Sequence, residues 1–154
     1  MRINELLQTT STTGTYACLV PNQDSCNRIA ALQASIGLDN PESVDKLHMT
    51  IIYSRRDCPR LKLGEHDITP VDGSIIGFKI FGDDKNILVA EIECANATKF
   101  HSYLKNEHGA THDFKNYIPH ITLTTTWNKT TIPTLPGAIK LQFDRIRIEH
   151  MQQH

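Results

Sequence analysis

Residues 46–52 of the 154-residue chain read KLHMTII, in which a histidine and a threonine two places apart interrupt an apolar run. Residues 117–125 read YIPHITLTT and contain the same histidine-x-threonine pattern 72 positions further on. Both stretches are short, apolar and rich in β-branched residues, which is typical of β-strands. The fold has to account for two polar pairs of one kind, each set in an apolar strand.

The segments upstream of the two patterns also agree. The apolar run 16–20 and the helical spacing after it end at Gly37, and the apolar run 87–94 and a second helical segment end at Gly109. Each glycine stands eleven residues before the histidine of its pattern. Glycine in this place is typical of a helix C-terminus. We therefore expect two structurally equivalent halves, about 15–82 and 86–150, within one domain covering 1–154.

The remaining segments complete each half. We expect Asp24 or Ser25 to cap the first helix and Asn96 or Thr98 to cap the second. We also expect an irregular loop over 57–73, a strand over 74–82, a hairpin turn at 82–86 and a final strand around 140–150. The predicted class is α/β (α+β), with two lobes of antiparallel sheet plus helices around a central cleft.

Side chains in a strand alternate between its two faces. Alternation over 119–125 puts Ile121 and Leu123 on one face, and His120, Thr122 and Thr124 on the other. The strand 47–53 divides in the same way. One face carries His48, Thr50 and Ile52, and the other carries Leu47, Met49, Ile51 and Tyr53. If helices cover the apolar faces, the two histidine-x-threonine faces line the cleft together.

This set of groups suits the cleavage of a phosphodiester. The reaction needs a base for the attacking hydroxyl and an acid for the leaving oxygen, and histidine supplies either role near neutral pH. Threonine hydroxyls can donate hydrogen bonds to the non-bridging oxygens. The candidate catalytic residues are therefore His48, Thr50, His120 and Thr122, and the arrangement requires no metal and no cofactor. The order of base and acid stays open at this point.

The composition limits the kinds of ligand and partner that the protein is expected to bind. The net charge is −1, and no run of Lys or Arg is longer than the pair at 55–56, so a basic footprint for long nucleic acid is missing. A small phosphate-containing substrate is more consistent with this charge. We see neither a signal peptide nor a membrane span, and we expect a cytoplasmic protein. No obligate protein partner is inferred.

Cysteine and the other histidines point to no metal site. The four cysteines contain no C-x-x-C pair and are expected to be reduced. His108 and His112 are four residues apart, but Gly109 should end the helix that would align them.

At the two patterns the chain resembles the 2H phosphoesterase superfamily, whose signature is a pair of H-x-[ST] motifs about half a chain apart. The Pro-His-Ile-Thr-Leu context of the second motif is common in that group. Size, charge and the region from TYACLV to KLHMTIIYS are most similar to the phage anti-CBASS phosphodiesterases. The resemblance implies metal-independent cleavage of 3′–5′ bonds in cyclic di- and trinucleotide messengers, which counters bacterial CBASS immunity. If the chain is phage-encoded, its place is the host cell cytoplasm.

Base contacts follow from alternation, and the resemblance favours the same regions. Bases are held by aromatic stacking and by hydrogen bonds to their edges. Ile76, Phe78 and Ile80 are expected on the apolar face of the strand 74–82, which leaves Phe81 on the other face. Ile148 is expected to be buried, so that Glu149 faces away from the core. The candidates are Tyr16, Phe81 and Glu149. Two alternatives stay open, a 2′,3′-cyclic-phosphate or 2′–5′ RNA phosphodiesterase and a non-catalytic nucleotide-sequestering protein.

Overall fold

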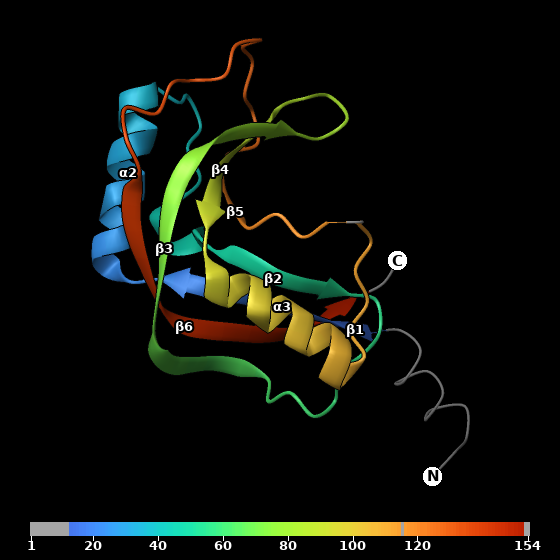
Figure 1. Ribbon diagram of the computed structural model, residues 1–154. Helices are drawn as coiled ribbons and strands as arrows, with labels where there is room; N and C mark the ends of the chain where they lie inside the picture. The colour runs from blue at the N-terminus through green and yellow to red at the C-terminus, as the bar shows by residue number, and fades with distance from the viewer. Residues whose placement is uncertain (1–12, 115, 153–154) are drawn as a thin grey trace.

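The computed structural model describes residues 13–114 and 116–152, and residues 1–12, 115, 153 and 154 lie outside this part. Figure 1 shows two helices on the outside of a set of antiparallel strands. The elements, in chain order, are β1 (Thr13–Pro21), α2 (Gln23–Ile36), η1 (Val44–Lys46), β2 (Met49–Ser54), β3 (Gly64–Phe81), β4 (Ile87–Glu93), α3 (Ala95–His108), β5 (His120–Thr124) and β6 (Ile139–Gln152).

The strands pair in the order β1-β2-β5-β4-β3-β6, and β6 pairs back to β1, so that the sheet closes on itself. Every pairing is antiparallel. The expected α+β class with antiparallel strands is therefore confirmed. The two expected sheets are continuous, however, because β2 meets β5 at one end and β3 bridges to β6 at the other.

The helices end as the sequence predicts and begin differently. Gly37 and Gly109 end α2 and α3 in the left-handed conformation, with φ of 76° and 67°. The N-cap of α2 is Asn22, whose side chain accepts a hydrogen bond from the Ser25 backbone N–H at 2.9 Å. The N-cap of α3 is Cys94. The predicted caps were wrong by two or more residues because several polar residues compete near each helix start.

The core lies between the closed sheet and the helices. α2 packs on β6 and β1 through Ile29 and Leu32, whereas α3 packs on β2 through Ala97 and Leu104. Full burial of a leucine or isoleucine side chain stabilises the fold by about 1.5–3 kcal/mol. The two helices thus contact β1, β2 and β6, and the motif side chains at the ends of β2 and β5 stay partly exposed.

A β-bulge in β2 overturns one part of the predicted alternation. Cys18 of β1 pairs with Thr50, but the preceding Ala17 pairs with Ile52, so Ile51 has no partner on β1. After an extra residue the side chains change faces. Ile52 is consequently buried in the core, and Tyr53, predicted on the apolar face, is 56% exposed on the other.

Two further irregularities correct the sequence prediction. The ladder between β3 and β4 shifts between Ile75 and Gly77, which turns Ile76 outward with 47% of its surface exposed. The ladder between β4 and β5 shifts at Leu88 and Val89. Thr124, expected beside Thr122, is buried instead, and its hydroxyl donates to the Asn40 carbonyl at 2.7 Å.

The segment 57–73 is less irregular than expected, because β3 already begins at Gly64. Its first part, Gly64–Asp67, pairs with the C-terminal part of β6, and pairing resumes at Val71. Pro70 lies in the break, where it cannot donate a ladder hydrogen bond. The hairpin turn after β3 is where it was predicted, with positive φ at Gly82 and Lys85. No helix within residues 13–114 and 116–152 is long and apolar enough to span a bilayer.

Candidate functional site

The two motif strands meet at a single residue pair, Met49 of β2 and Ile121 of β5. Both side chains are fully buried. In an antiparallel pair the flanking residues then face each other across the junction. His48 therefore lies across from Thr122, and Thr50 lies across from His120, all on the face away from the core. We call these four residues the motif face.

Both motif histidines are held in the same tautomer. The Nδ1 atom of His48 is 2.8 Å from the Lys46 carbonyl oxygen, and that of His120 is 2.7 Å from the Ile118 carbonyl oxygen. A carbonyl oxygen only accepts, so each Nδ1 carries a proton and donates it. In the neutral rings Nε2 is then the atom with a free lone pair, which is the atom an acid–base reaction uses.

The surroundings of the two histidines differ. Burial lowers the pKa of His120, the hydrogen bond to the Ile118 carbonyl opposes this change, and the positive charge of a protonated His48 lowers the pKa further. Because a lowered pKa favours the neutral imidazole, the His120 ring has a free lone pair available to accept a proton at neutral pH.

Tyr16 connects to both residues of the first motif. Its hydroxyl lies 3.0 Å from the Thr50 Oγ1 atom, and its ring meets the His48 ring at a steep angle with centroids 6.1 Å apart. Burial is the largest cause that raises the pKa of the Tyr16 phenol, so the hydroxyl keeps its proton at physiological pH.

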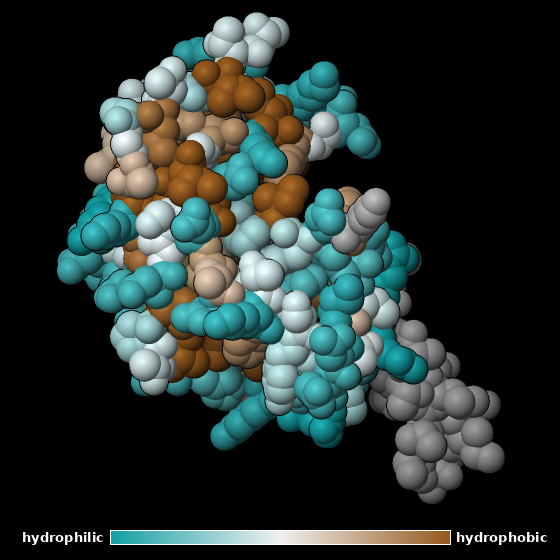
Figure 2. Space-filling model, viewed as in Figure 1, coloured by the Kyte–Doolittle hydropathy of each residue, from teal (hydrophilic) through white to brown (hydrophobic). Residues whose placement is uncertain are grey.

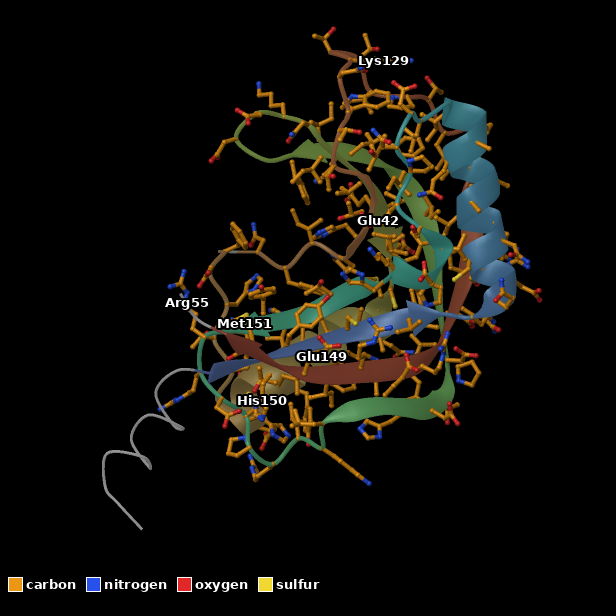
Figure 3. The ribbon with its side chains drawn as sticks, turned by 180° about the vertical axis from the view of Figure 1, so that it is seen from behind. Glu42, Arg55, Lys129, Glu149, His150 and Met151 are labelled. Carbon is orange, nitrogen blue, oxygen red and sulfur yellow. The ribbon has the colours of Figure 1, made fainter. Side chains whose placement is uncertain are left out.

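The other two predicted base contacts also adjoin this face. The Phe81 ring, at the end of β3, meets the His120 ring edge to face with centroids 5.0 Å apart. Glu149 of β6 is the cross-strand neighbour of Tyr16, and its exposed side chain is labelled in Figure 3 beside β1. Each motif histidine thus has one aromatic ring against it, and all seven predicted residues are gathered by the sheet.

The sequence prediction missed Tyr53. The bulge in β2 places it across from Tyr16, and the two rings are 5.3 Å apart at an angle of 68°. An exposed aromatic residue near the end of an otherwise buried strand was the available signal, but strict alternation assigned it to the core.

The molecular surface is indented on one side. Figure 2 shows this indentation between the β3–β4 hairpin and residues 116–119, which lead into β5. A separate cavity of about 1080 Å³ lies between the starts of α2 and α3 and the strands β3 and β6, and none of the four motif residues lines it. Among residues 13–114 and 116–152, no three His, Cys, Asp or Glu side chains are grouped so as to hold a metal ion.

Comparison with known proteins identifies the family. The family model described as anti-CBASS protein Acb1 matches residues 13–154. The chain belongs to this family. Two phage proteins illustrate the similarity. The anti-CBASS protein Acb1 of Escherichia phage RB16 is 34% identical, and the alignment covers 71% of this chain and 62% of the RB16 protein. The anti-CBASS protein Acb1 of Acinetobacter phage Ac42 is 37% identical, and the alignment covers 71% of this chain and 71% of the Ac42 protein. The chain thus aligns with less than two thirds of the RB16 protein.

Solved structures support the fold. The protein TT0787 of Thermus thermophilus has a TM-score of 0.64 at 12% identity, with 87% of this chain and 86% of that chain covered. Escherichia coli LigT complexed with 3′-AMP has a TM-score of 0.51 at 11% identity, with 92% and 99% covered. Both have the 2H phosphoesterase fold, so the fold expected from the resemblance is confirmed. The roles of individual site residues stay predictions.

Proposed function

We propose that this protein is a metal-independent phosphodiesterase that cleaves the 3′–5′ bonds of cyclic di- or trinucleotide messengers and thereby counters CBASS immunity. The observation that carries the proposal is the junction of β2 with β5. It places two histidines of matched tautomer and two threonines on one uncovered face. The chain's membership of the anti-CBASS Acb1 family supports the choice of substrate.

In the proposed first step, the Nε2 atom of His120 takes the proton of a ribose 2′-hydroxyl. The freed oxygen attacks the adjacent phosphorus, and the bond from phosphorus to the 5′-oxygen breaks. Protonated His48 gives its Nε2 proton to that leaving oxygen. The product is an opened chain ending in a 2′,3′-cyclic phosphate, which water then hydrolyses with the two histidines in exchanged roles.

The threonines stabilise the charge that develops on the phosphate. Thr50 and Thr122 flank the junction from opposite strands, so their hydroxyls can approach the phosphate from two sides. The Tyr16 hydroxyl and Thr50 Oγ1 lie 3.0 Å apart, and the Tyr16 phenol stays protonated because burial raises its pKa. In the proposed reactive arrangement Tyr16 is the donor of this hydrogen bond, which leaves the Thr50 hydrogen free to point at a non-bridging oxygen. Donors oriented in advance in this way are an effective source of rate acceleration.

The bases on either side of the scissile phosphate have separate aromatic neighbours. Phe81 lies beside His120, whereas Tyr16 and Tyr53 lie beside His48 and Thr50. Glu149 stands across from Tyr16, where its carboxylate can accept a hydrogen bond from an exocyclic amino group. Because the named relatives are phage proteins, the proposed place of action is the cytoplasm of the infected cell.

The test is an assay in EDTA of wild type, His48→Ala and His120→Ala. The substrates are 3′–5′ and 2′–5′ cyclic dinucleotides, a cyclic trinucleotide and an RNA with a 2′,3′-cyclic phosphate. His66→Ala is the matched control, because His66 instead binds the Lys62 carbonyl through Nε2. We expect cleavage of the 3′–5′ cyclic substrates by wild type and by the control, and loss of at least about 100-fold in kcat for each motif variant.

Each contrary result has a distinct meaning. Loss of wild-type activity in EDTA contradicts the metal-independent mechanism, and activity that survives both motif substitutions removes the histidines from the chemistry. Cleavage of the RNA end alone assigns the protein to the RNA-end enzymes. Tight binding without cleavage of any substrate identifies a sequestering protein.

A further inference from the structure

We propose that Tyr117, assisted by His101, is a positioning residue that holds Thr50 in the orientation needed for catalysis. The inference rests on the proposed function, because it assigns Thr50 a hydrogen bond to the reacting phosphate. Neither Tyr117 nor His101 belongs to the two motifs, and neither lies on the motif face. Both act through the backbone of β2.

Both contacts are short; the one made by His101 is buried and the one made by Tyr117 is part-buried. The Tyr117 hydroxyl donates to the Thr50 carbonyl oxygen at 2.7 Å, and His101 Nδ1 donates to the Ile51 carbonyl oxygen at 2.7 Å. The two rings stack in parallel, with centroids 4.2 Å apart and planes 6° apart. His101 has only 5% of its surface exposed, and burial lowers its pKa, so that the neutral ring with a proton on Nδ1 is favoured.

The bulge in β2 explains why these donors are needed. In a regular strand, successive carbonyls point to opposite edges and each finds a partner on a neighbouring strand. Here Ile51 is unpaired on β1, and the ladder to β5 consists of the pair at Met49 alone. A buried carbonyl without a donor is costly. Tyr117 and His101 therefore replace the ladder at Thr50 and Ile51, the two residues after the junction.

The segment that carries Tyr117 is fastened to β2 at a second place. The backbone N–H of Arg55 donates to Thr111 Oγ1 at 2.8 Å, and that of Thr111 donates to Ser54 Oγ at 3.0 Å. Arg55 also forms an ion pair with Asp113 at 2.9 Å. Thr111 and Asp113 are thus attached to the end of β2, and Tyr117 follows them in the chain, three residues before His120.

Thr50 is consequently held through both its backbone and its side chain. Its carbonyl oxygen accepts from Tyr117, and its Oγ1 atom is hydrogen-bonded to the Tyr16 hydroxyl. The backbone contact fixes where the Cα atom lies relative to His120 across the junction, and the side-chain contact fixes where the hydroxyl points. The first motif is therefore aligned by a residue supplied from the entrance to the second, which makes the geometry of the two motifs interdependent.

The experiment is a double-mutant cycle on kcat and KM with the 3′–5′ cyclic dinucleotide that wild type cleaves fastest. Its variants are Tyr117→Phe, Thr50→Val and the double variant. Tyr117→Phe removes only the hydroxyl and keeps the stacked ring. We expect kcat to fall by roughly tenfold to a hundredfold with KM nearly unchanged, because a misplaced donor affects the transition state. In the Thr50→Val background, Tyr117→Phe should change kcat by less than about twofold.

Tyr103→Phe is the matched control, since this exposed tyrosine on α3 contacts His108 and should keep wild-type kcat. His101→Asn, which retains a donor near the Nδ1 position, should lose less activity than His101→Ala. Thermal unfolding of each variant establishes that it is folded under the assay conditions.

The possible failures are distinguishable. If wild type cleaves no cyclic dinucleotide, or if Thr50→Val keeps full activity, the proposed function or the role of Thr50 fails, and this inference fails with it. If Thr50→Val is impaired while Tyr117→Phe keeps wild-type kcat, only the inference is overturned. Additive losses in the double variant also overturn it, since they assign Tyr117 a structural role independent of Thr50.

Discussion

The hydrogen bond between Tyr16 and Thr50 offers a sharp test of how the first motif works. Tyr16→Phe removes the hydroxyl, at 3.0 Å from Thr50 Oγ1, and keeps the ring beside His48. A hydrogen bond of this kind contributes about 0.5–1.5 kcal/mol to the free energy of unfolding. For a chain of 154 residues, a loss of about 1 kcal/mol lowers Tm by roughly 2–4 °C.

The effect on catalysis should be larger than this small loss of stability. Complete removal of an oriented donor to a developing oxyanion costs roughly 100–1000-fold in kcat, and here the donor remains but loses its direction, so about tenfold is expected. Steady-state kinetics on a cyclic dinucleotide measure kcat, and a melting curve followed by circular dichroism measures Tm. Wild-type kcat combined with the lowered Tm would refute the reasoning, because Tyr16 would then stabilise the fold without orienting Thr50.

The remaining predictions concern pH and backbone geometry. Because the pKa of His120 is lowered, kcat/KM should decline on the acid side only below about pH 6.5, as a pH–rate profile would reveal. The lowered pKa values of His120 and His101 mean that the unfolded chain binds more protons than the folded one. The free energy of unfolding should therefore decrease as pH falls from about 6.5 through the folded-state pKa values. Urea titrations at several pH values should show that this free energy depends less steeply on pH in His101→Asn than in wild type. Gly37→Ala, at φ 76°, should lose about 1–2 kcal/mol in the same titrations, whereas Gly77→Ala, with open space and no positive φ, should change by less than about 0.5 kcal/mol.

The overall fold was predictable because the deciding signals are local. Gly37 and Gly109 end helices that their sequence contexts already define, and the alternation of Ile121 and Leu123 with the second motif needs no knowledge of the partner strand. The motif residues then come together through a junction of two fully buried side chains. Repeated short-range patterns were thus sufficient to predict a long-range arrangement.

The misplaced residues share one physical cause. Tyr53, Ile76 and Thr124 each follow or occupy a shift in a ladder, and such a shift depends on which strand lies alongside. Nothing in MTIIYS marks Ile51 as the residue without a partner on β1. The side chains that compensate, from His101 and Tyr117, lie 50 and 67 positions away in the sequence. Alternation alone therefore cannot find a bulge, although it finds the strand.

The junction between β2 and β5 also separates two kinds of evolutionary change. The pair of Met49 and Ile121 sets the register between the two motifs, and Tyr117 aligns Thr50 beside it. Aromatic and charged neighbours such as Phe81 and Glu149 come from β3 and β6, strands that do not take part in this contact. The proposed function therefore predicts that substitutions in those outer strands and their loops change which base is accepted and leave the reaction itself unchanged. Under the proposed function, recognition and chemistry are thus carried by separate strands and can change independently.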